Sequence, residues 1–287
     1  MTAAATASDR PSPVAATTMA RLACLIIALA ALVAAFGPPR RIAQRFGWRF
    51  GRRTPVLFQR LLCAGLAVKV RRHGTFSSAP KRLIVANHVS WLDIPVLGSL
   101  EPMSFLAKKE LGDHLVGREL VALQGVVYVD RRRRSCIPAV NARIVETMRA
   151  GSPVVLFAEA TTGDGNRLLR FRSSHFEAIR LAAFDDNGGP AVIQPVYLNY
   201  SSIAGLPLAR PERPRVAWYG DMTFLPHFFQ YVRAGGVTCD VYYGPPIRVL
   251  PDTDRKTAAW ATEAAVRQLA AEARARKRAI FPGRENA

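Results

Sequence analysis

The chain of 287 residues is long enough for one large domain with an appendage, and a hydrophobic content of 49% can supply a sizeable core. These values exclude a wholly disordered chain, although residues 1–17 are predicted to be a disordered tail and residues 282–287 a flexible C-terminus. The net charge of +19 indicates an anionic partner, either nucleic acid or the anionic face of a membrane.

The first part of the chain is basic and apolar at once. Residues 10–92 contain fourteen Lys or Arg and no Asp or Glu, and residues 22–36 form an unbroken apolar run followed by Arg40 and Arg41. As a helix this run would be about 22 Å long, which is marginal against a hydrocarbon core of about 30 Å. A signal peptide is the alternative, but arginines directly after the run oppose export.

A second apolar segment, residues 56–68, carries Arg60 and is followed by Lys69, in the pattern of an interfacial amphipathic helix. We therefore expect residues 18–75 to form a membrane-associated helical segment, with ordinary core helices as the alternative. The arginines between the two segments would hold the rest of the chain at the cytoplasmic face of the inner membrane. Anionic membrane lipids are the expected partners. Nucleic acid is not expected, because few aromatic residues are interleaved with these arginines.

From residue 80 onward, short apolar runs alternate with helical stretches, which predicts an α/β domain over residues 76–281. The expected strands are residues 83–86, 103–107, 126–129, 154–157, 191–198, 215–219 and 237–243. The expected helices are residues 136–150, 174–183 and 254–280. Scattered cysteines and histidines predict neither a disulfide framework nor a metal site, and no nucleotide-binding glycine motif is present.

An imidazole and a carboxylate follow the first of these strands, as His88 and Asp93. A histidine oriented by an acid is a general base that suits the deprotonation of a hydroxyl. Five residues along an ideal helix would point the two side chains about 140° apart, so the segment must bend. The bend fits a helix that begins near Asp93 with Pro95 in its first turn. The alternative is a capping box of Ser90 and Asp93 with an uninvolved histidine.

Three further polar clusters stand at the ends of predicted strands, where α/β folds place their sites. Residues 126–129 lead into Asp130 and Arg131, residues 154–157 lead into Ala158 and Glu159, and residues 191–194 lead into Pro195. HxxxxD, VVYVDR, FAEATT and VIQPVY, in this order, resemble the four signature blocks of the glycerolipid acyltransferases, whose type member is 1-acylglycerol-3-phosphate acyltransferase. The resemblance covers about residues 80–200.

The resemblance implies a mixed sheet flanked by helices, preceded by membrane-associated N-terminal helices. It also implies acyl transfer from acyl-carrier protein or coenzyme A, as co-substrate and not as a cofactor, to the hydroxyl of a lysolipid acceptor. His88 and Asp93 would be the catalytic pair, and no serine or cysteine nucleophile is required. The residues that the resemblance assigns to substrate binding are Arg131, Glu159, Ala160, Thr161, Thr162, Arg172 and Pro195.

This chain departs from the usual third block, F-P-E-G-T-R, at Ala158, Ala160 and Thr162. Without a guanidinium at 162 the site lacks a bidentate phosphate ligand, which weakens the case for lysophosphatidic acid as acceptor. Ala160 replaces a glycine, so this turn either differs or is strained. The continuation T-T-G-D-G-N-R-L-L resembles lyso-ornithine lipid acyltransferases.

Lysophosphatidic acid, giving phosphatidic acid, remains the first expected acceptor and lyso-ornithine lipid the alternative. A thioester hydrolase and a basic nucleic-acid-binding protein are the competing functions, since a His-Asp base activates water as readily as an alcohol.

Overall fold

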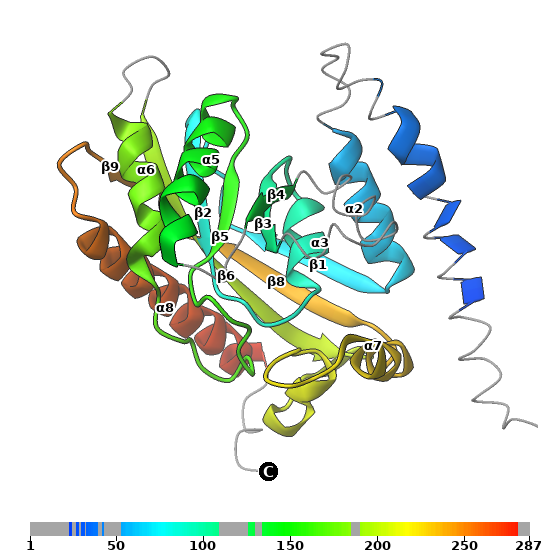
Figure 1. Cartoon of the computed structure of the whole chain (residues 1–287). Helices are drawn as coiled ribbons and strands as arrows, with labels where there is room; N and C mark the ends of the chain where they lie inside the picture. The colour runs from blue at the N-terminus through cyan, green and yellow to red at the C-terminus, as the bar shows by residue number, and fades with distance from the viewer. Residues whose placement is uncertain are drawn as a thin grey trace, which may run out of the picture.

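The computed structural model describes residues 53–108, 126–129, 134–184 and 190–280, with a few positions between 23 and 42. In this part of the chain a mixed sheet lies between two groups of helices (Figure 1). The strands are β1 Val68–His73, β2 Lys81–Ala86, β3 Ser104–Lys108, β4 Val126–Val129, β5 Val154–Phe157, β6 Ala191–Ile203, β7 Leu206–Pro207, β8 Val237–Tyr243 and β9 Ile247–Val249. The helices are α2 Thr54–Gly65, α3 Asp93–Gly98, α5 Ile137–Arg149, α6 Phe176–Ala183, α7 Phe224–Arg233 and α8 Arg255–Ile280, with 3-10 turns η3 Arg134–Cys136, η4 Ser173–His175 and η5 Arg210–Arg215.

The sheet is mixed because it contains both parallel and antiparallel strand pairs. Its order is β1-β8-β6-β2-β5-β3-β4, with β7 and β9 paired to β6. Strands β2, β5, β3 and β4 are parallel neighbours, and β2 is also parallel to β6. Strand β6 is antiparallel to β8, β7 and β9. The predicted α/β fold with a mixed sheet is therefore confirmed.

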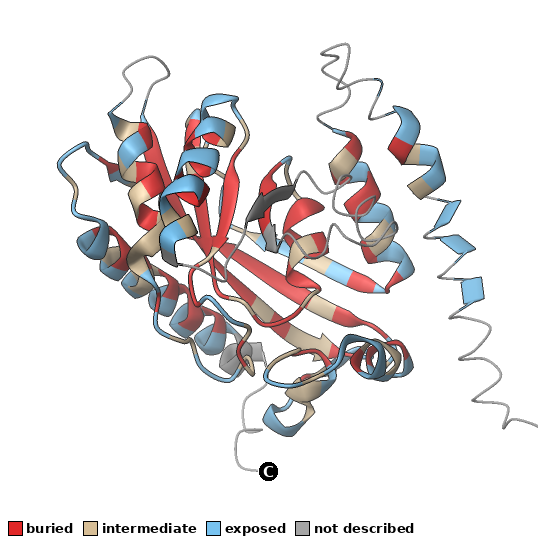
Figure 2. Cartoon of the chain, viewed as in Figure 1, coloured by how far each residue is buried: buried red, intermediate tan, exposed pale blue. Residues whose placement is uncertain are grey.

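Each face of the sheet packs against its own hydrophobic core. One core joins the sheet to α5, α6 and α8, and includes Leu83, Ile144 and Ile179, all fully buried. The other joins the opposite face to α3 and α7 and includes Ile84, Leu97 and Tyr231. Burial is densest along the central strands (Figure 2). Strand β2 alternates between the two cores, which explains why its sequence is apolar at every position from 83 to 86.

Six of the seven predicted strands are present, although β6 continues five residues past the predicted end. The prediction of a strand over residues 215–219 is wrong. The segment begins at the end of η5 and continues without regular structure, and the backbone N–H of Trp218 donates to Val89 O at 2.9 Å. Val216 and Ala217 are each 1% exposed. These residues are therefore apolar because they are buried, although their backbone pairs with no strand that the structure describes.

The helix predicted from residue 56 to residue 68 ends at Gly65, and Val68 begins an edge strand. Phe58 and Cys63 of α2 are buried, whereas Leu57 and Leu61 are exposed on its outer side. The stretch predicted to be helical up to residue 75 thus contains β1, whose pairing with β8 joins it to the main sheet. Apolar and polar residues alternate only over the first three positions of V-K-V-R-R-H, so the sequence pattern did not indicate a strand here.

The predicted apolar run 22–36 lies only partly within the described residues, and the flexible ends 1–17 and 282–287 lie outside them. Within the described residues, no helix has both the length and the apolarity that crossing a bilayer requires.

The carboxyl ends of β2 and β5 meet beside the middle of β6. Ala86, the last residue of β2, pairs with Phe157, the last residue of β5, and with Val196 in β6. The two segments after β2 and β5 therefore leave the sheet side by side. They carry His88 and Glu159.

Candidate active site

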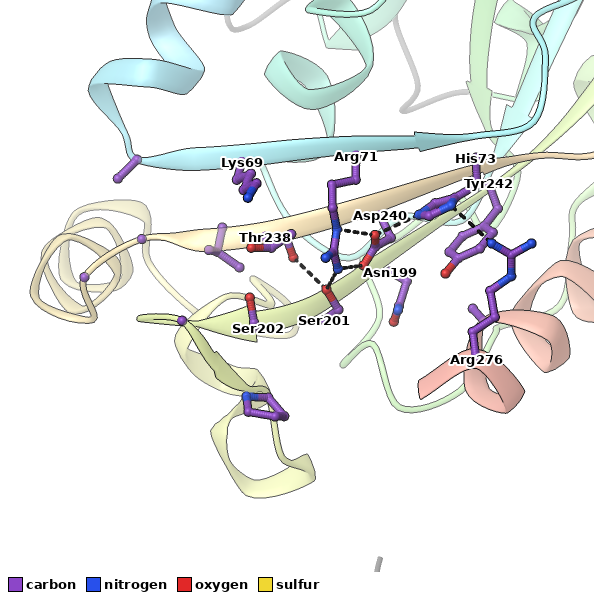
Figure 3. Close-up of a pocket in the computed structure, with 17 residues that line it drawn as sticks. Lys69, Arg71, His73, Asn199, Ser201, Ser202, Thr238, Asp240, Tyr242 and Arg276 are labelled. Atoms are coloured by element: carbon purple, nitrogen blue, oxygen red, sulfur yellow. Dashed lines mark hydrogen bonds and ion pairs between the residues drawn. The ribbon is translucent and has the colours of Figure 1, made fainter. Parts of the chain in front are cut away.

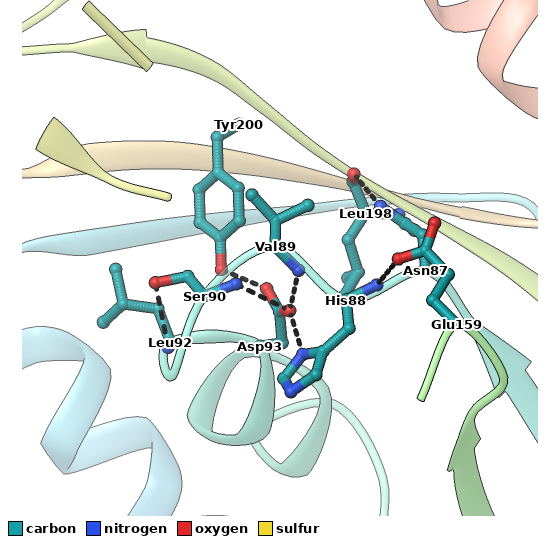
Figure 4. A network of polar contacts seen from close by, with 9 residues as sticks. All are labelled: Asn87, His88, Val89, Ser90, Leu92, Asp93, Glu159, Leu198 and Tyr200. Atoms are coloured by element: carbon teal, nitrogen blue, oxygen red, sulfur yellow. Dashed lines mark hydrogen bonds and ion pairs between the residues drawn. The ribbon is translucent and has the colours of Figure 1, made fainter. Parts of the chain in front are cut away.

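His88 and Asp93 are in direct contact, as the sequence predicted. His88 follows β2 in a loop that Asn87 anchors to β6: the Asn87 amide accepts a hydrogen bond from Leu198 N at 2.7 Å and donates one to Leu198 O at 3.1 Å. The chain then turns so that α3 begins at Asp93. This turn brings His88 Nδ1 to 2.8 Å from Asp93 Oδ2 (Figure 4).

Asp93 is fully buried and surrounded by hydrogen-bond donors. Its Oδ2 accepts from Val89 N at 2.7 Å and from Ser90 N at 3.0 Å, and its Oδ1 accepts from Tyr200 Oη at 2.6 Å. A group among donors alone acts as an acceptor, so Asp93 is held as a carboxylate. His88 then carries its proton on Nδ1, which leaves the lone pair of Nε2 available.

The capping contact and the histidine contact turn out to be compatible. The bond from Ser90 N to Asp93 is one half of the capping box that the sequence offered as the alternative. The same carboxylate oxygen also meets the imidazole. One acidic side chain therefore fixes the loop and orients the histidine.

Tyr200 and Phe157 complete the setting of the histidine. Burial, with the nearby Asp93 charge second, raises the pKa of Tyr200 well above its usual value, so its hydroxyl remains a donor. The His88 ring stacks on Phe157 with 4.0 Å between centroids and 12° between planes, and its side chain is 21% exposed. The ring plane is fixed, and the histidine is open to an incoming substrate.

Glu159 supports the backbone around His88. It is 5% exposed; its Oε2 accepts from His88 N and its Oε1 from Leu169 N, both at 2.8 Å. Burial raises the pKa of Glu159 to about 7, although these two hydrogen bonds act in the opposite direction. The sequence predicted a substrate-binding residue here, and the described contacts are those of a positioning residue.

The turn after Glu159 has a backbone conformation that favours glycine, although the residue there is an alanine. Ala160 has φ of 62°, in the left-handed region, so the strained alternative is the one that the structure adopts. Ala160 and Thr161 are exposed and Thr162 is half-buried. Gly163 N donates to His88 O at 2.8 Å, which attaches this turn to the histidine loop.

For the other predicted site residues, the structure describes contacts of the backbone or places in the sheet. Arg172 has an exposed side chain, and its backbone N–H donates to Ala158 O at 2.8 Å, closing the base of the loop. Pro195 is buried inside β6, between the residues that pair with β9 and those that pair with β8. A proline lacks the N–H of a ladder, so this junction tolerates it, and its position is structural. Arg131 lies outside the described residues, and its role stays a prediction.

A second His-Asp pair occurs among the described residues, in a cavity of about 840 Å³ beside β1, β6, β8 and α8 (Figure 3). His73 Nε2 lies 2.9 Å from Asp240 Oδ1, but His73 Nδ1 accepts from Arg276 Nη1 at 3.4 Å. Arg71 also binds Asp240 through two hydrogen bonds of 2.7 Å. Both ring nitrogens of His73 are therefore engaged, so His73 has no free nitrogen with which to act as a base.

Sequence reasoning missed Tyr200 and gave no role to Phe157. Tyr200 is 107 residues from Asp93, and nothing in its local pattern indicates the contact. Phe157 stands at the start of FAEATT, so its position at a strand end was visible although its stacking was not.

Comparisons with known proteins place the chain in a family. A family model described as Acyltransferase matches residues 67–199. The chain is 36% identical over 223 residues to a lyso-ornithine lipid O-acyltransferase of Brucella abortus, covering 78% of this chain and 83% of the relative. It is 35% identical over 130 residues to a 1-acyl-sn-glycerol-3-phosphate acyltransferase of Neisseria gonorrhoeae, covering 45% of this chain and 48% of the relative.

The crystal structure of the 1-acyl-sn-glycerophosphate (LPA) acyltransferase from Thermotoga maritima has the same fold, with a TM-score of 0.61. It is 14% identical and the match covers 90% of this chain and 98% of that one. The matched family model includes His88 and Asp93, and the alignment to the Brucella abortus enzyme covers most of both chains. The chain therefore belongs to the lysolipid acyltransferase family.

Proposed function

We propose that His88 is the general base of this lysolipid acyltransferase and that the acceptor is lyso-ornithine lipid. The observation that carries the mechanism is the buried Asp93 carboxylate 2.8 Å from His88 Nδ1, because it leaves Nε2 as the free basic nitrogen. The acyl group arrives as a thioester of acyl-carrier protein or coenzyme A.

The reaction needs no covalent enzyme intermediate. His88 Nε2 removes the proton from the acceptor hydroxyl while its oxygen attacks the thioester carbonyl. Asp93 stabilises the imidazolium that forms and keeps its ring in place. The tetrahedral intermediate collapses with cleavage of the carbon–sulfur bond, and the leaving thiolate takes the proton from Nε2. The products are the ester and the free thiol, and His88 returns to its initial state.

The choice of acceptor rests on two observations. Residue 162 is a threonine, which cannot bind a phosphate in the bidentate manner of an arginine. The relative named for lyso-ornithine lipid aligns with 78% of the chain, against 45% for the relative named for 1-acyl-sn-glycerol-3-phosphate. Lysophosphatidic acid, the acceptor that the sequence put first, becomes the second candidate.

The enzyme would work at a membrane surface. The basic residues after the apolar run 22–36 favour the cytoplasmic face of the inner membrane for the catalytic domain. Anionic lipids there would attract the arginines of this region.

A competition assay tests the acceptor. The full-length protein is given lyso-ornithine lipid and lysophosphatidic acid together, once with acyl-carrier protein thioester and once with the coenzyme A thioester. We expect acylation mainly of lyso-ornithine lipid. Preferential formation of phosphatidic acid would reverse the assignment, and rapid release of fatty acid without acceptor would identify a hydrolase.

Substitution of the two histidines tests the base. His88→Ala should abolish transfer and leave membrane association intact. His73→Ala is the matched control, because it removes the other histidine that contacts an aspartate, and transfer should persist. Asp93→Asn should lower kcat much more than it raises KM, since it acts through the imidazole. Substantial turnover by a folded His88→Ala protein would exclude His88 as the base.

A further inference from the structure

Helix α7 exposes apolar side chains where a surface helix is normally polar. Phe224 is 45% exposed and Leu225 is 63% exposed, Pro226 is also exposed, and Phe228 and Phe229 are half-buried. On its other side the helix buries His227, Tyr231 and Val232. A helix at a water interface needs only one apolar face. We refer to Phe224, Leu225, Pro226, Phe228 and Phe229 as the α7 patch.

The α7 patch is continuous with the loop that holds the catalytic histidine. Trp91, three residues after His88, has its ring centroid 5.5 Å from that of Phe224 and 5.8 Å from that of Phe228. Its Nε1 donates to His227 Nδ1 at 3.1 Å. Trp218, whose backbone N–H binds Val89 O, also meets Phe224 edge-on at 6.4 Å. Aromatic packing thus connects the exposed patch to the segment between His88 and Asp93.

Basic residues border the patch. Residues 210–233 contain four arginines against Glu212 and Asp221. Arg210 and Arg215 on η5 and Arg233 at the end of α7 are exposed, although Arg215 contacts Glu212 at 3.4 Å. Aromatic and aliphatic side chains beside arginines are the composition of elements that lie in a membrane interface.

We propose that the α7 patch inserts into the interface of an anionic bilayer. A helix of ten residues is about 15 Å long, so it lies in the interface and does not span it. A bilayer is favoured over a protein partner because the enzyme's substrate is itself a lipid and the surrounding charge is positive. Insertion would bring lipid molecules of the bilayer next to Trp91. The hydroxyl of a lysolipid at that position could then approach His88. This last step rests on the proposed function, whereas insertion itself does not.

A fluorescent label at position 225 tests insertion without any measurement of activity. Cys24 and Cys136 are changed to Ser, because Cys63 and Cys239 are buried, and Leu225→Cys is labelled with an environment-sensitive dye in the full-length protein. The matched control is a label at Trp260→Cys, since Trp260 is 74% exposed on α8, on the opposite side of the sheet. Vesicles of phosphatidylcholine with phosphatidylglycerol are added to each.

We expect the label at 225 to shift to shorter wavelength and brighten several-fold on vesicle addition, and the label at 260 to stay unchanged. A vesicle-bound protein whose label at 225 remains in water would overturn the proposal. So would a shift that depends on protein concentration and needs no vesicles, because it would identify a second copy of the chain as the occupant.

Affinity for the same vesicles gives an independent test. The double variant Phe224→Ser, Leu225→Ser should bind about tenfold more weakly, equivalent to about 1.4 kcal/mol, because both side chains leave the apolar part of the interface. Trp260→Ser removes a larger exposed side chain and should bind as the wild type does. Equal weakening by both variants would mean that general hydrophobicity, and not the α7 patch, controls binding.

Discussion

Replacing Tyr200 by phenylalanine tests how the Asp93 carboxylate is held. The substitution keeps the ring that fills the core and removes only the hydroxyl, which donates to Asp93 Oδ1 at 2.6 Å. Tyr200 is 2% exposed and Asp93 is fully buried, so water does not replace the lost donor. A hydrogen bond to a buried charged group contributes about 1.5–3 kcal/mol. We expect Tyr200→Phe to lose about 2 kcal/mol of unfolding free energy.

The effect on catalysis should be confined to kcat. Three donors still hold Oδ2 of Asp93, but Oδ1 is free to turn and the imidazole loses part of its orientation. We expect kcat to fall about tenfold, or about 1.4 kcal/mol, with little change in KM. Steady-state acylation at saturating acceptor, corrected for the folded fraction, measures this.

Tyr231→Phe is the matched control, because Tyr231 is similarly buried and its hydroxyl donates to Leu66 O at 2.7 Å instead of to the Asp93 carboxylate. It should lose stability without the loss in kcat. Equal losses of kcat in the two variants, or wild-type kcat in Tyr200→Phe, would refute the positioning role of Tyr200.

Two further changes concern the loop after β5. The pKa of Glu159 is raised from 4.5 to about 7 by burial, so the folded state retains this proton where the unfolded state has lost it. Wild-type stability relative to Glu159→Gln should therefore be greatest below pH 4.5 and fall by about 3 kcal/mol as the pH rises to about 7, measured by chemical unfolding. Ala160→Gly should raise the unfolding free energy by about 0.5–1 kcal/mol, because a glycine adopts φ of 62° without steric cost.

Controls make both results interpretable. A stability difference between wild type and Glu159→Gln that does not change with pH would show that Glu159 titrates normally. Ala264→Gly, at an exposed helical position of α8, should lose about 1 kcal/mol, opposite in sign to Ala160→Gly. Destabilisation by both glycine substitutions would mean that the turn at Ala160 is unstrained.

Local sequence patterns predicted the strands correctly where burial of the strand made its residues apolar. Strands β4, β5 and β8 have the bounds that the sequence predicted. For β5 the reason is plain, because a strand buried between two helical layers is apolar throughout. The same reasoning failed at residues 215–219, where Val216 and Ala217 are buried without a strand. It also overlooked α7, where the exposed Phe224 and Leu225 do not follow the usual pattern of polar residues on the outer side.

The sequence by itself determined the α/β class and the family. It also predicted the contact between His88 and Asp93, because the two residues lie close together in the chain after a strand and need no distant partner to meet. Only the tertiary structure decided what holds them. The contact of Tyr200 with Asp93 and that of Glu159 with the His88 backbone join residues 107 and 71 positions apart. Such contacts depend on which strands become neighbours and in what register, and strand order is a property of the whole sheet and not of any local segment.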